Sequence, residues 1–361
     1  MDDSSLLEPL GLLGTFLCIL LAIFLIAVPS RKALANRMLA GFLLLTAVDI
    51  SGWFMGGWWL AHPLLNELRI VVVFLQMPMF LGFVWFGCFE DEKLERRHLM
   101  HLVPAVAVAG ALTAAGEADL PWLVIALHLQ YYLYFAAAIW ILIRFRRILR
   151  DRLSNGRSGT LEWLTAMVSV SFFAHAIVVG RAVITGLTGP DWTMGLQVTS
   201  AVIVLAVMLW IAFRALLSPD LFRGVDRVLA SAATEIRGEG VSEDQPLASV
   251  ERLQTYMKGH QPFLDPELSI TRLARQCGIP AKELSGLINQ RMGVHFFDFI
   301  NQYRVEHAST LLAAEQDMTV MDILYASGFN SKSSFNTAFK KHQGQTPSAF
   351  RKAVRAIEMG R

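Results

Sequence analysis

A series of long apolar segments in the first 217 residues limits the fold of this chain more than any other feature. A helix needs about 20 mostly apolar residues to cross the hydrocarbon core of a bilayer. Seven such segments run over residues 7–28, 38–60, 70–89, 99–115, 122–143, 161–187 and 194–217, the fourth being the shortest. The sequence therefore predicts an all-α protein whose residues 1–217 form a seven-helix domain in a lipid bilayer.

The amino-acid composition supports this interpretation. Residues of the types AVILMFWYC make up 54% of the chain and charged residues only 17%, whereas soluble domains carry about 25% charged residues. Such a composition excludes intrinsic disorder, collagen and coiled coil. The three cysteines, Cys18, Cys88 and Cys277, have a spacing that indicates neither disulfides nor a zinc site.

Lys and Arg residues concentrate in every second connection between the apolar segments. The first and third connections hold three each and the fifth holds six, whereas the second holds only Arg69 and the fourth and sixth hold none. Because positively charged loops stay in the cytoplasm, this pattern places the N-terminus outside and the C-terminus inside, which requires an odd number of spans. The acidic flank of the first segment argues against a cleaved signal peptide.

Polar side chains inside the predicted spans are costly and are therefore candidates for function. Asp49 lies near the middle of the second span. Arg181 differs from it in depth by about 13 Å, at about 1.5 Å per residue, so the two are not expected to pair. A second group falls at or beyond the midplane on the outer side, and it comprises Gln76, His128, Gln130, His175, Arg181 and Gln197.

Two interpretations of these polar residues stay open. They could form a ligand-sensing pocket open to the outside, which would take a small-molecule or membrane signal. Alternatively, the His and Gln side chains join neighbouring helices by hydrogen bonds, which is the more common arrangement. Neither His128 nor His175 has a His or carboxylate partner three or four residues away on its helix, so we expect no metal site.

The composition changes after the last apolar segment. Residues 218–247 are rich in Asp, Gly, Glu, Ser and Pro and predict a cytoplasmic linker, which includes an amphipathic stretch at 225–236. Residues 248–361 are hydrophilic and form a predicted helical domain. Residues 245–361 carry a net charge of +4, against −2 for residues 1–244, which is a mild indication of a polyanionic partner.

Two segments of the hydrophilic domain repeat one design of helix, glycine turn and helix, at about 269–291 and 319–342. Gly278 and Gly328 can adopt the left-handed conformation that ends the first helix of each unit, as in a helix-turn-helix. Ser269 and Thr319 are expected to cap those helices. The apolar residues expected to pack inside are Leu273, Ala274, Leu284, Leu287 and Ile288 in one unit, and Ile323, Ala326, Phe329, Phe335 and Phe339 in the other.

The outward side chains of each second helix are small or hydrogen-bonding. They are Lys282, Ser285, Asn289 and Gln290 in the first unit, and Lys332, Ser333, Asn336, Thr337, Lys340 and Lys341 in the second. Such residues pair with base edges and phosphates in a major groove. A helix over residues 296–313, about 27 Å long, would join the units, so that one chain could enter two successive major grooves about 34 Å apart.

These residues resemble the AraC/XylS-type DNA-binding domain of bacterial transcription regulators over residues 257–352. The second unit carries the specific signature in GFNSKSSFN at 328–336, FKK at 339–341, Gly344 and TPSAFR at 346–351; supporting matches are Leu284, Ser285, Ile288, Asn289, Phe297, Tyr303, Arg304, Ala308, Leu311 and Leu312. The resemblance implies that Arg304 and Lys340 support the interface or contact phosphate, and that RNA polymerase is a partner. Departures at Leu324, Gly286 and Thr337 mean that the base preference is not inherited.

The sequence thus predicts a membrane-anchored one-component transcription regulator of a bacterial inner membrane, which binds double-stranded promoter DNA and needs neither catalysis nor a cofactor. Tethering to the membrane favours a homodimer. A rival is a membrane transporter or enzyme with a fused regulatory domain, in which Asp49, His128 and His175 perform proton or substrate chemistry. A third alternative is a membrane domain that only anchors the regulator.

Overall fold

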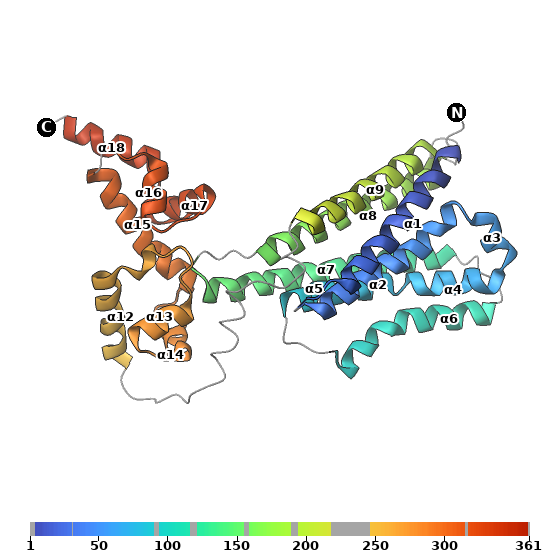
Figure 1. The fold of residues 1–361 in the computed structure, drawn as a ribbon, viewed down its shortest axis with the longest axis horizontal. Helices are drawn as coiled ribbons and strands as arrows, with labels where there is room; N and C mark the ends of the chain where they lie inside the picture. The colour runs from blue at the N-terminus through green and yellow to red at the C-terminus, as the bar shows by residue number, and fades with distance from the viewer. Residues whose placement is uncertain are drawn as a thin grey trace. The chain divides into compact units, whose positions relative to one another are not determined.

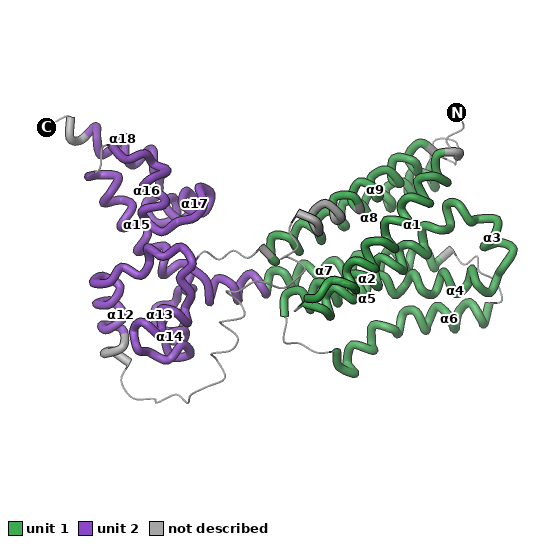
Figure 2. The backbone as a smooth tube through the Cα atoms, viewed as in Figure 1, with its two compact units in different colours: residues 1–144, 159–226 green, residues 145–158, 227–361 purple. Residues whose placement is uncertain are grey.

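The computed structural model of the protein describes residues 4–30, 32–89, 94–115, 121–154, 159–188, 194–217, 246–314 and 317–359. All regular elements in these ranges are helices, as expected, apart from an isolated antiparallel bridge between Leu153 and Ser269. The chain divides into two compact units (Figures 1 and 2). Unit 1 comprises residues 1–144 and 159–226, and unit 2 comprises residues 145–158 and 227–361. The predicted linker and its amphipathic stretch lie almost entirely outside the described residues.

Unit 1 is a bundle of apolar helices. Its elements are α1 (Ser4–Ala27), α2 (Ala33–Ile50), the short η1 (Ser51–Trp53), α3 (Gly56–Ala61), α4 (Pro63–Val73), α5 (Gln76–Cys88), η2 (Arg96–Leu102), α6 (Val103–Ala115), most of α7 (Pro121–Arg152), α8 (Gly159–Thr188) and α9 (Met194–Leu217). Helix α1 packs along α2 and α9, and α2 packs on α5. Many apolar side chains on the outside of the bundle are exposed, such as Phe16, Ile23 and Ile125, as expected for helices that face lipid.

Six helical segments of the described chain are long and apolar enough to cross a membrane, where the sequence predicted seven. They run over Leu6–Ala27, Ala33–Trp53, Pro63–Cys88, Arg96–Ala115, Trp122–Arg152 and Thr160–Leu187. The predicted seventh segment coincides with α9, but its described apolar part, Gly195–Val207, is shorter than a bilayer requires. These helices make the protein a candidate for a multi-pass membrane protein.

Two predicted spans have different boundaries in the structure. The second ends at Trp53 rather than at residue 60, because the helix tightens into η1 and a separate short helix, α3, follows. The third consists of α4 and α5, which meet at Phe74 and Leu75. Pro78 stands one turn after this junction and has no N–H to donate to the carbonyl oxygen of Phe74, so the regular helical bond is missing there.

Unit 2 contains the last turns of α7 and all the helices of the hydrophilic region. The latter are α12 (Pro246–His260), η5 (Pro262–Leu264), α13 (Ile270–Cys277), α14 (Ala281–Gly286), the π-helical turn η6 (Leu287–Arg291), α15 (Phe296–Ala314), α16 (Val320–Ala326), α17 (Lys332–Gln343) and α18 (Pro347–Met359). The long helix predicted over residues 296–313 is therefore confirmed as α15.

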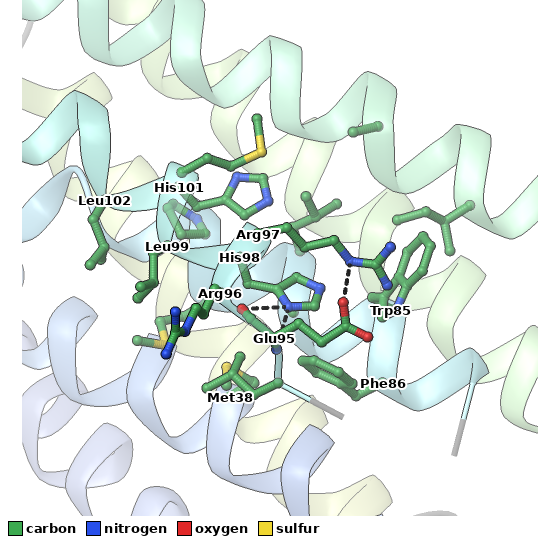
Figure 3. A pocket seen from close by; sticks show the side chains of 18 of the residues that line it. Met38, Trp85, Phe86, Glu95, Arg96, Arg97, His98, Leu99, His101 and Leu102 are labelled. Carbon is green, nitrogen blue, oxygen red and sulfur yellow. Dashed lines mark hydrogen bonds and ion pairs between the residues drawn. The ribbon is translucent and has the colours of Figure 1, made fainter. Parts of the chain in front are cut away.

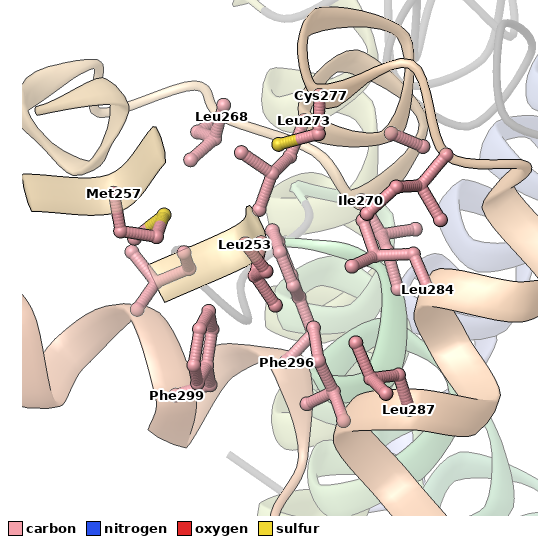
Figure 4. Packing of buried hydrophobic residues seen from close by; sticks show 14 of the residues in the cluster. Leu253, Met257, Leu268, Ile270, Leu273, Cys277, Leu284, Leu287, Phe296 and Phe299 are labelled. Carbon is pink, nitrogen blue, oxygen red and sulfur yellow. The ribbon is translucent and has the colours of Figure 1, made fainter. Parts of the chain in front are cut away.

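Each helix-turn-helix unit has a hydrophobic core of its own, and α15 contributes to both. Leu253 and Met257 of α12 pack with Leu273, Leu284 and the first half of α15 in one core (Figure 4). The second half of α15 packs with α16 and α17 in the other core, around Phe335 and Phe339. The single helix α15 thus positions the two helix-turn-helix motifs relative to each other.

Candidate nucleic-acid interface and the polar residues of unit 1

The second helix-turn-helix consists of α16 and α17. Thr319 caps α16 by accepting a hydrogen bond from the Asp322 amide at 3.1 Å, as predicted. Gly328 follows α16 with φ of +79°, which confirms the predicted left-handed turn. Ser331 then caps α17 by accepting from the Ser334 amide at 3.2 Å. A cap at Ser331 was not predicted, although a serine directly before a helical run is the ordinary signal for one.

Helix α17 presents one polar face and one buried face. Phe335, Ala338 and Phe339 are buried, so the helix is fixed in rotation about its axis. The opposite face carries the six residues predicted to contact DNA, which follow each other at helical spacing: Lys332, Ser333, Asn336, Thr337, Lys340 and Lys341. Five of the six are exposed and Asn336 is half-buried. The last four of these residues, with Thr346, line a shallow open hollow of about 430 Å³.

The first helix-turn-helix follows the same plan. Ser269 caps α13 by accepting from the Arg272 amide at 3.3 Å, and Gly278 ends α13 with φ of +63°, both as predicted. The second helix begins as α14 and continues as the π turn η6. Of the DNA contacts predicted there, Lys282 and Gln290 are exposed, whereas Ser285 and Asn289 are half-buried. The Asn289 amide donates to the Ser285 hydroxyl at 3.3 Å, which places these two on one side of the helix.

Lys341 is held by a carboxylate from another helix. Its ammonium lies 2.7 Å from Oδ1 of Asp298, which belongs to the first turn of α15. The Lys341 side chain is nevertheless 55% exposed, whereas Asp298 is only 13% exposed. Lys341 is therefore both accessible to a ligand and partly neutralised, a relationship that the sequence did not predict.

Arg304 does not face the surface, which corrects one of the two roles that the family resemblance implied for it. It is 1% exposed, and its Nε donates to the carbonyl oxygen of Phe263 at 2.7 Å. Its other nitrogens donate to Asp265 and Ser154. Burial lowers the pKa of Arg304 to about 10. This burial contradicts a direct phosphate contact. The other implied role, support of the interface, stays a prediction.

One position of the predicted core is also different. Ala326 was expected in the core of the second helix-turn-helix, but it is exposed. Leu324 is buried instead, with 1% exposure. The other nine residues named for the two cores are buried. Leu324, which departs from the family pattern, thus occupies the inward position of α16.

In unit 1 the structure links several of the predicted polar residues into a continuous chain. The carboxylate of Asp49 lies near the side chain of Gln76 and near the positive charge of Arg69, whose Nη1 also lies 3.5 Å from the Asp49 carbonyl oxygen. The Tyr131 hydroxyl donates to Oε1 of Gln76. We refer to these residues, together with His175 and His128, as the polar chain.

The two histidines complete the polar chain. The ring of Tyr131 stacks on that of His175, with centroids 4.0 Å apart. Nδ1 of His128 lies 3.3 Å from Nε2 of His175. The sequence pointed to Asp49 and the histidines but missed Arg69 as the cation beside Asp49, because the break after α2 and the return in α4 could not be read from it.

Gln130 has a local structural task. It is 7% exposed, and its amide donates to the carbonyl oxygen of Phe74 at 2.8 Å, the acceptor that Pro78 leaves without a helical donor. Neither Arg181 nor Gln197 is joined to the polar chain by a side-chain hydrogen bond within the described ranges. Among the described residues, no group of three His, Cys, Asp or Glu side chains is arranged to hold a metal ion.

Unit 1 also contains an apolar cavity of about 630 Å³ between α2, α5, η2 and α7 (Figure 3). Met38, Trp85 and Trp140 are among the residues that line it. Its polar residues lie on η2 and directly before it. His101, near the end of η2, bonds the Tyr134 hydroxyl at 2.8 Å. At the start of η2 the Glu95 side chain accepts from the His98 amide and the Glu95 amide donates to His98. These polar groups thus stabilise the helix end. This cavity could not be predicted from the sequence, because most of its lining residues are common in any apolar helix.

Comparison with known proteins finds a family match within unit 2. Residues 273–353 match the model of a family described as "Helix-turn-helix domain". The HTH-type transcriptional regulator GlxA of Rhizobium meliloti is 30% identical over 31% of this chain and 32% of its own length. The uncharacterized HTH-type transcriptional regulator YtdP of Bacillus subtilis is 32% identical over 27% of this chain and 12% of its own length.

A solved structure of a Listeria innocua protein of unknown function is 32% identical over 29% of this chain and 95% of its own, with a TM-score of 0.26. The chain spans about a third or less of the length of the two curated relatives. Both relatives bear the name of transcriptional regulators, and the family match contains both turn glycines and the polar face of α17. Residues 273–353 are therefore similar to a helix-turn-helix domain, and the curated relatives that match this chain are named as transcriptional regulators.

Proposed function

We propose that this chain is a one-component transcription regulator, anchored in a bacterial inner membrane by unit 1 and bound to promoter DNA through unit 2. The polar face of α17 is the observation that carries this proposal. It combines amide, hydroxyl and ammonium groups at helical spacing, which is the chemistry that base edges and phosphates of a major groove require. The charge pattern of the connections supports an outside N-terminus and a cytoplasmic DNA-binding domain.

The geometry of unit 2 favours one chain reading two grooves. Helix α15 has 19 residues, which correspond to about 28 Å. A joining helix of this length is compatible with recognition helices that enter successive major grooves, about 34 Å apart. The chain would thus bind two blocks of sequence about one turn apart, and a homodimer in the membrane would bind two such pairs. RNA polymerase is the partner through which such binding changes transcription.

The polar chain of unit 1 supports a sensing role for the bundle. A half-buried carboxylate, a tyrosine and two histidine rings lie in a row across several helices in apolar surroundings, where such groups are costly and therefore candidates for function. A signal that displaces one member would change the contacts of all the others. Asp49, His128 and His175 would serve transport or catalysis equally well, so the rival function rests on the same residues.

The test uses the full chain in lipid nanodiscs and a pool of randomised duplexes. We expect enrichment of a motif with two blocks about one helical turn apart, and a salt dependence that reflects several phosphate contacts. Asn336→Ala should relax the preference at one base pair and weaken binding by about 1–3 kcal/mol. The control is Lys352→Ala, an exposed cation on α18. A folded wild-type chain that enriches no motif would contradict the proposal.

A further inference from the structure

Helix α7 is longer than a membrane span. It contains 32 residues, about 48 Å of helix, whereas the hydrocarbon core is about 30 Å thick. Its last turns carry Arg144, Arg146, Arg147, Arg150 and Arg152, which cannot remain in lipid without cost. From Phe145 onward the helix belongs to unit 2 (Figure 2). The bundle and the DNA-binding domain therefore share one continuous helix.

The end of α7 is fixed to the start of the first helix-turn-helix. Leu153 forms an antiparallel bridge with Ser269, the residue that caps α13. The Ser154 amide donates to the carbonyl oxygen of Leu268 at 3.0 Å. Leu149, Leu153 and Ser154 are all nearly or completely buried. This end is hence a packed part of unit 2 and not a loose tether.

Ser154 also supplies acceptors to the buried Arg304. Nη1 of Arg304 lies 3.2 Å from the Ser154 carbonyl oxygen, and Nη2 lies 3.1 Å from its hydroxyl. Two of the four oxygen atoms around this guanidinium thus come from the end of α7. Because a buried guanidinium without acceptors is costly, Arg304 ties the end of α7 to α15. The Arg304 guanidinium also lies 5.7 Å from the ring centre of Phe329 in the second turn.

A carboxylate of α15 joins α7 to the recognition helix. Oδ2 of Asp298 accepts from Nη2 of Arg150 at 3.0 Å, while Oδ1 of the same carboxylate accepts from Lys341 at 2.7 Å. Two cations therefore share one negative charge, and one positive charge remains uncompensated in this cluster. Without Arg150, the carboxylate would neutralise Lys341 alone, and the polar face of α17 would lose that positive charge.

We propose that residues 145–154, the last turns of α7 and the two residues after them, form a docked arm that sets the DNA affinity of unit 2, because Arg150 competes with Lys341 for Asp298. A signal that withdraws the arm would leave Lys341 to Asp298 and remove one phosphate contact. The effect on DNA rests on the proposed function, whereas the competition for Asp298 exists without DNA.

The first measurement is made without DNA on the full chain in nanodiscs. The rate at which an acylating reagent modifies Lys341 is followed by mass spectrometry, with Lys352 as internal reference. Arg150→Gln should slow the modification of Lys341 roughly two-fold, since a partly exposed ion pair is worth that much, and Asp298→Asn should accelerate it. Arg147→Gln, an exposed cation one turn earlier on α7, is the matched control and should change nothing.

The second measurement titrates the selected duplex across salt. Arg150→Gln should weaken binding several-fold at low salt and reduce the salt slope by up to about one. In the Asp298→Asn background the same change should have no effect. The proposed arm would be contradicted if Arg150→Gln left the acylation rate of Lys341 unchanged. It would also be contradicted if Arg150→Gln weakened DNA binding equally with Asp298 and with Asn at position 298. A wild-type chain that binds no duplex but shows the expected labelling would overturn the proposed function instead.

Discussion

Gly328 lies directly against the carbonyl oxygen of Phe263, so that a Cβ added to the glycine would stand 2.4 Å from that oxygen. The same oxygen accepts the hydrogen bond from Nε of Arg304. The turn of the second helix-turn-helix is therefore closed over η5 and the buried guanidinium. Glycine is required at this position for two reasons: φ is positive, and there is no space for a side chain.

Gly328→Ala should strongly destabilise unit 2. We expect a loss of about 1–2 kcal/mol from the left-handed backbone and a further loss of about 1–3 kcal/mol from the steric conflict. The change is measured by urea-induced unfolding of the full chain, with proteolytic cleavage of unit 2 as the signal for its unfolding. Gly344→Ala is the control, because φ is also positive there but no atom lies within 4 Å of the added Cβ. Equal losses in both variants would show that the close approach to η5 has no energetic weight.

Gln130→Leu should lower the thermal stability of the bundle by roughly 1–2 kcal/mol. The substitution leaves the Phe74 carbonyl oxygen without a donor in apolar surroundings. The measurement is thermal unfolding of the full chain in nanodiscs, with Gln197→Leu as a comparison on α9. If Gln130→Leu is as stable as the wild type, the junction of α4 and α5 does not need this hydrogen bond.

Asp49→Asn should alter how transcription responds to external conditions while the purified chain keeps its DNA affinity. The substitution removes the charge that faces Arg69 but retains a side chain that can bond Gln76. A promoter fusion, read across changes of medium, measures the response, and Ser200→Ala on α9 serves as control. Loss of a substrate flux or turnover in the variant, with an unchanged transcriptional response, would favour the transporter or enzyme function.

Unit 2 should become less stable as the pH falls below about 6.5. Burial lowers the pKa of His307 from its usual value of 6.5, so the unfolded chain binds a proton more readily than the folded one. The stabilisation is thus complete above pH 6.5 and is lost as the pH falls through the folded pKa. Burial and Lys341 lower the pKa of His342 as well, so its contribution has the same sign.

The measurement compares unfolding of unit 2 in the full chain at pH 7.5 and at lower pH. His307→Gln should remove part of the dependence and leave the part due to His342. His260→Gln, at the exposed end of α12, should retain the whole dependence. A steeper dependence in His307→Gln than in the wild type would contradict the assignment.

The helix-turn-helix units could be predicted from the sequence because their signals are local. A glycine with positive φ, a serine or threonine before an apolar run, and a phenylalanine every three or four residues each specify one turn of structure. Ser269, Thr319, Gly278 and Gly328 follow these rules in the structure. Local signals did not predict which residues of α16 are buried, since Leu324 lies inside where Ala326 was expected. On a helix of seven residues, packing against α15 and α17 decides which side chains face inward.

Relationships between distant elements could not be predicted in this way. The acceptors of Arg304 come from η5 and from Ser154, 150 residues away in the chain. Gln130 could be recognised as polar and inside a span, but its role depends on a carbonyl oxygen that Pro78 frees on another helix. The partner of Asp49 depends on the turn that returns Arg69 to it. In each case tertiary packing, and not a periodic pattern, selects the partner.

The continuity of α7 has a consequence for how such a protein can change over time. Each residue inserted into an α-helix turns everything beyond it by about 100° and advances it by about 1.5 Å. One or two residues inserted between Arg150 and Ser154 would move the two contacts of this segment with α15 out of register, because their partners, Asp298 and Arg304, both belong to that helix. The spacing between Arg150 and Ser154 is thus a length that α15 dictates, whatever residues occupy the positions between them.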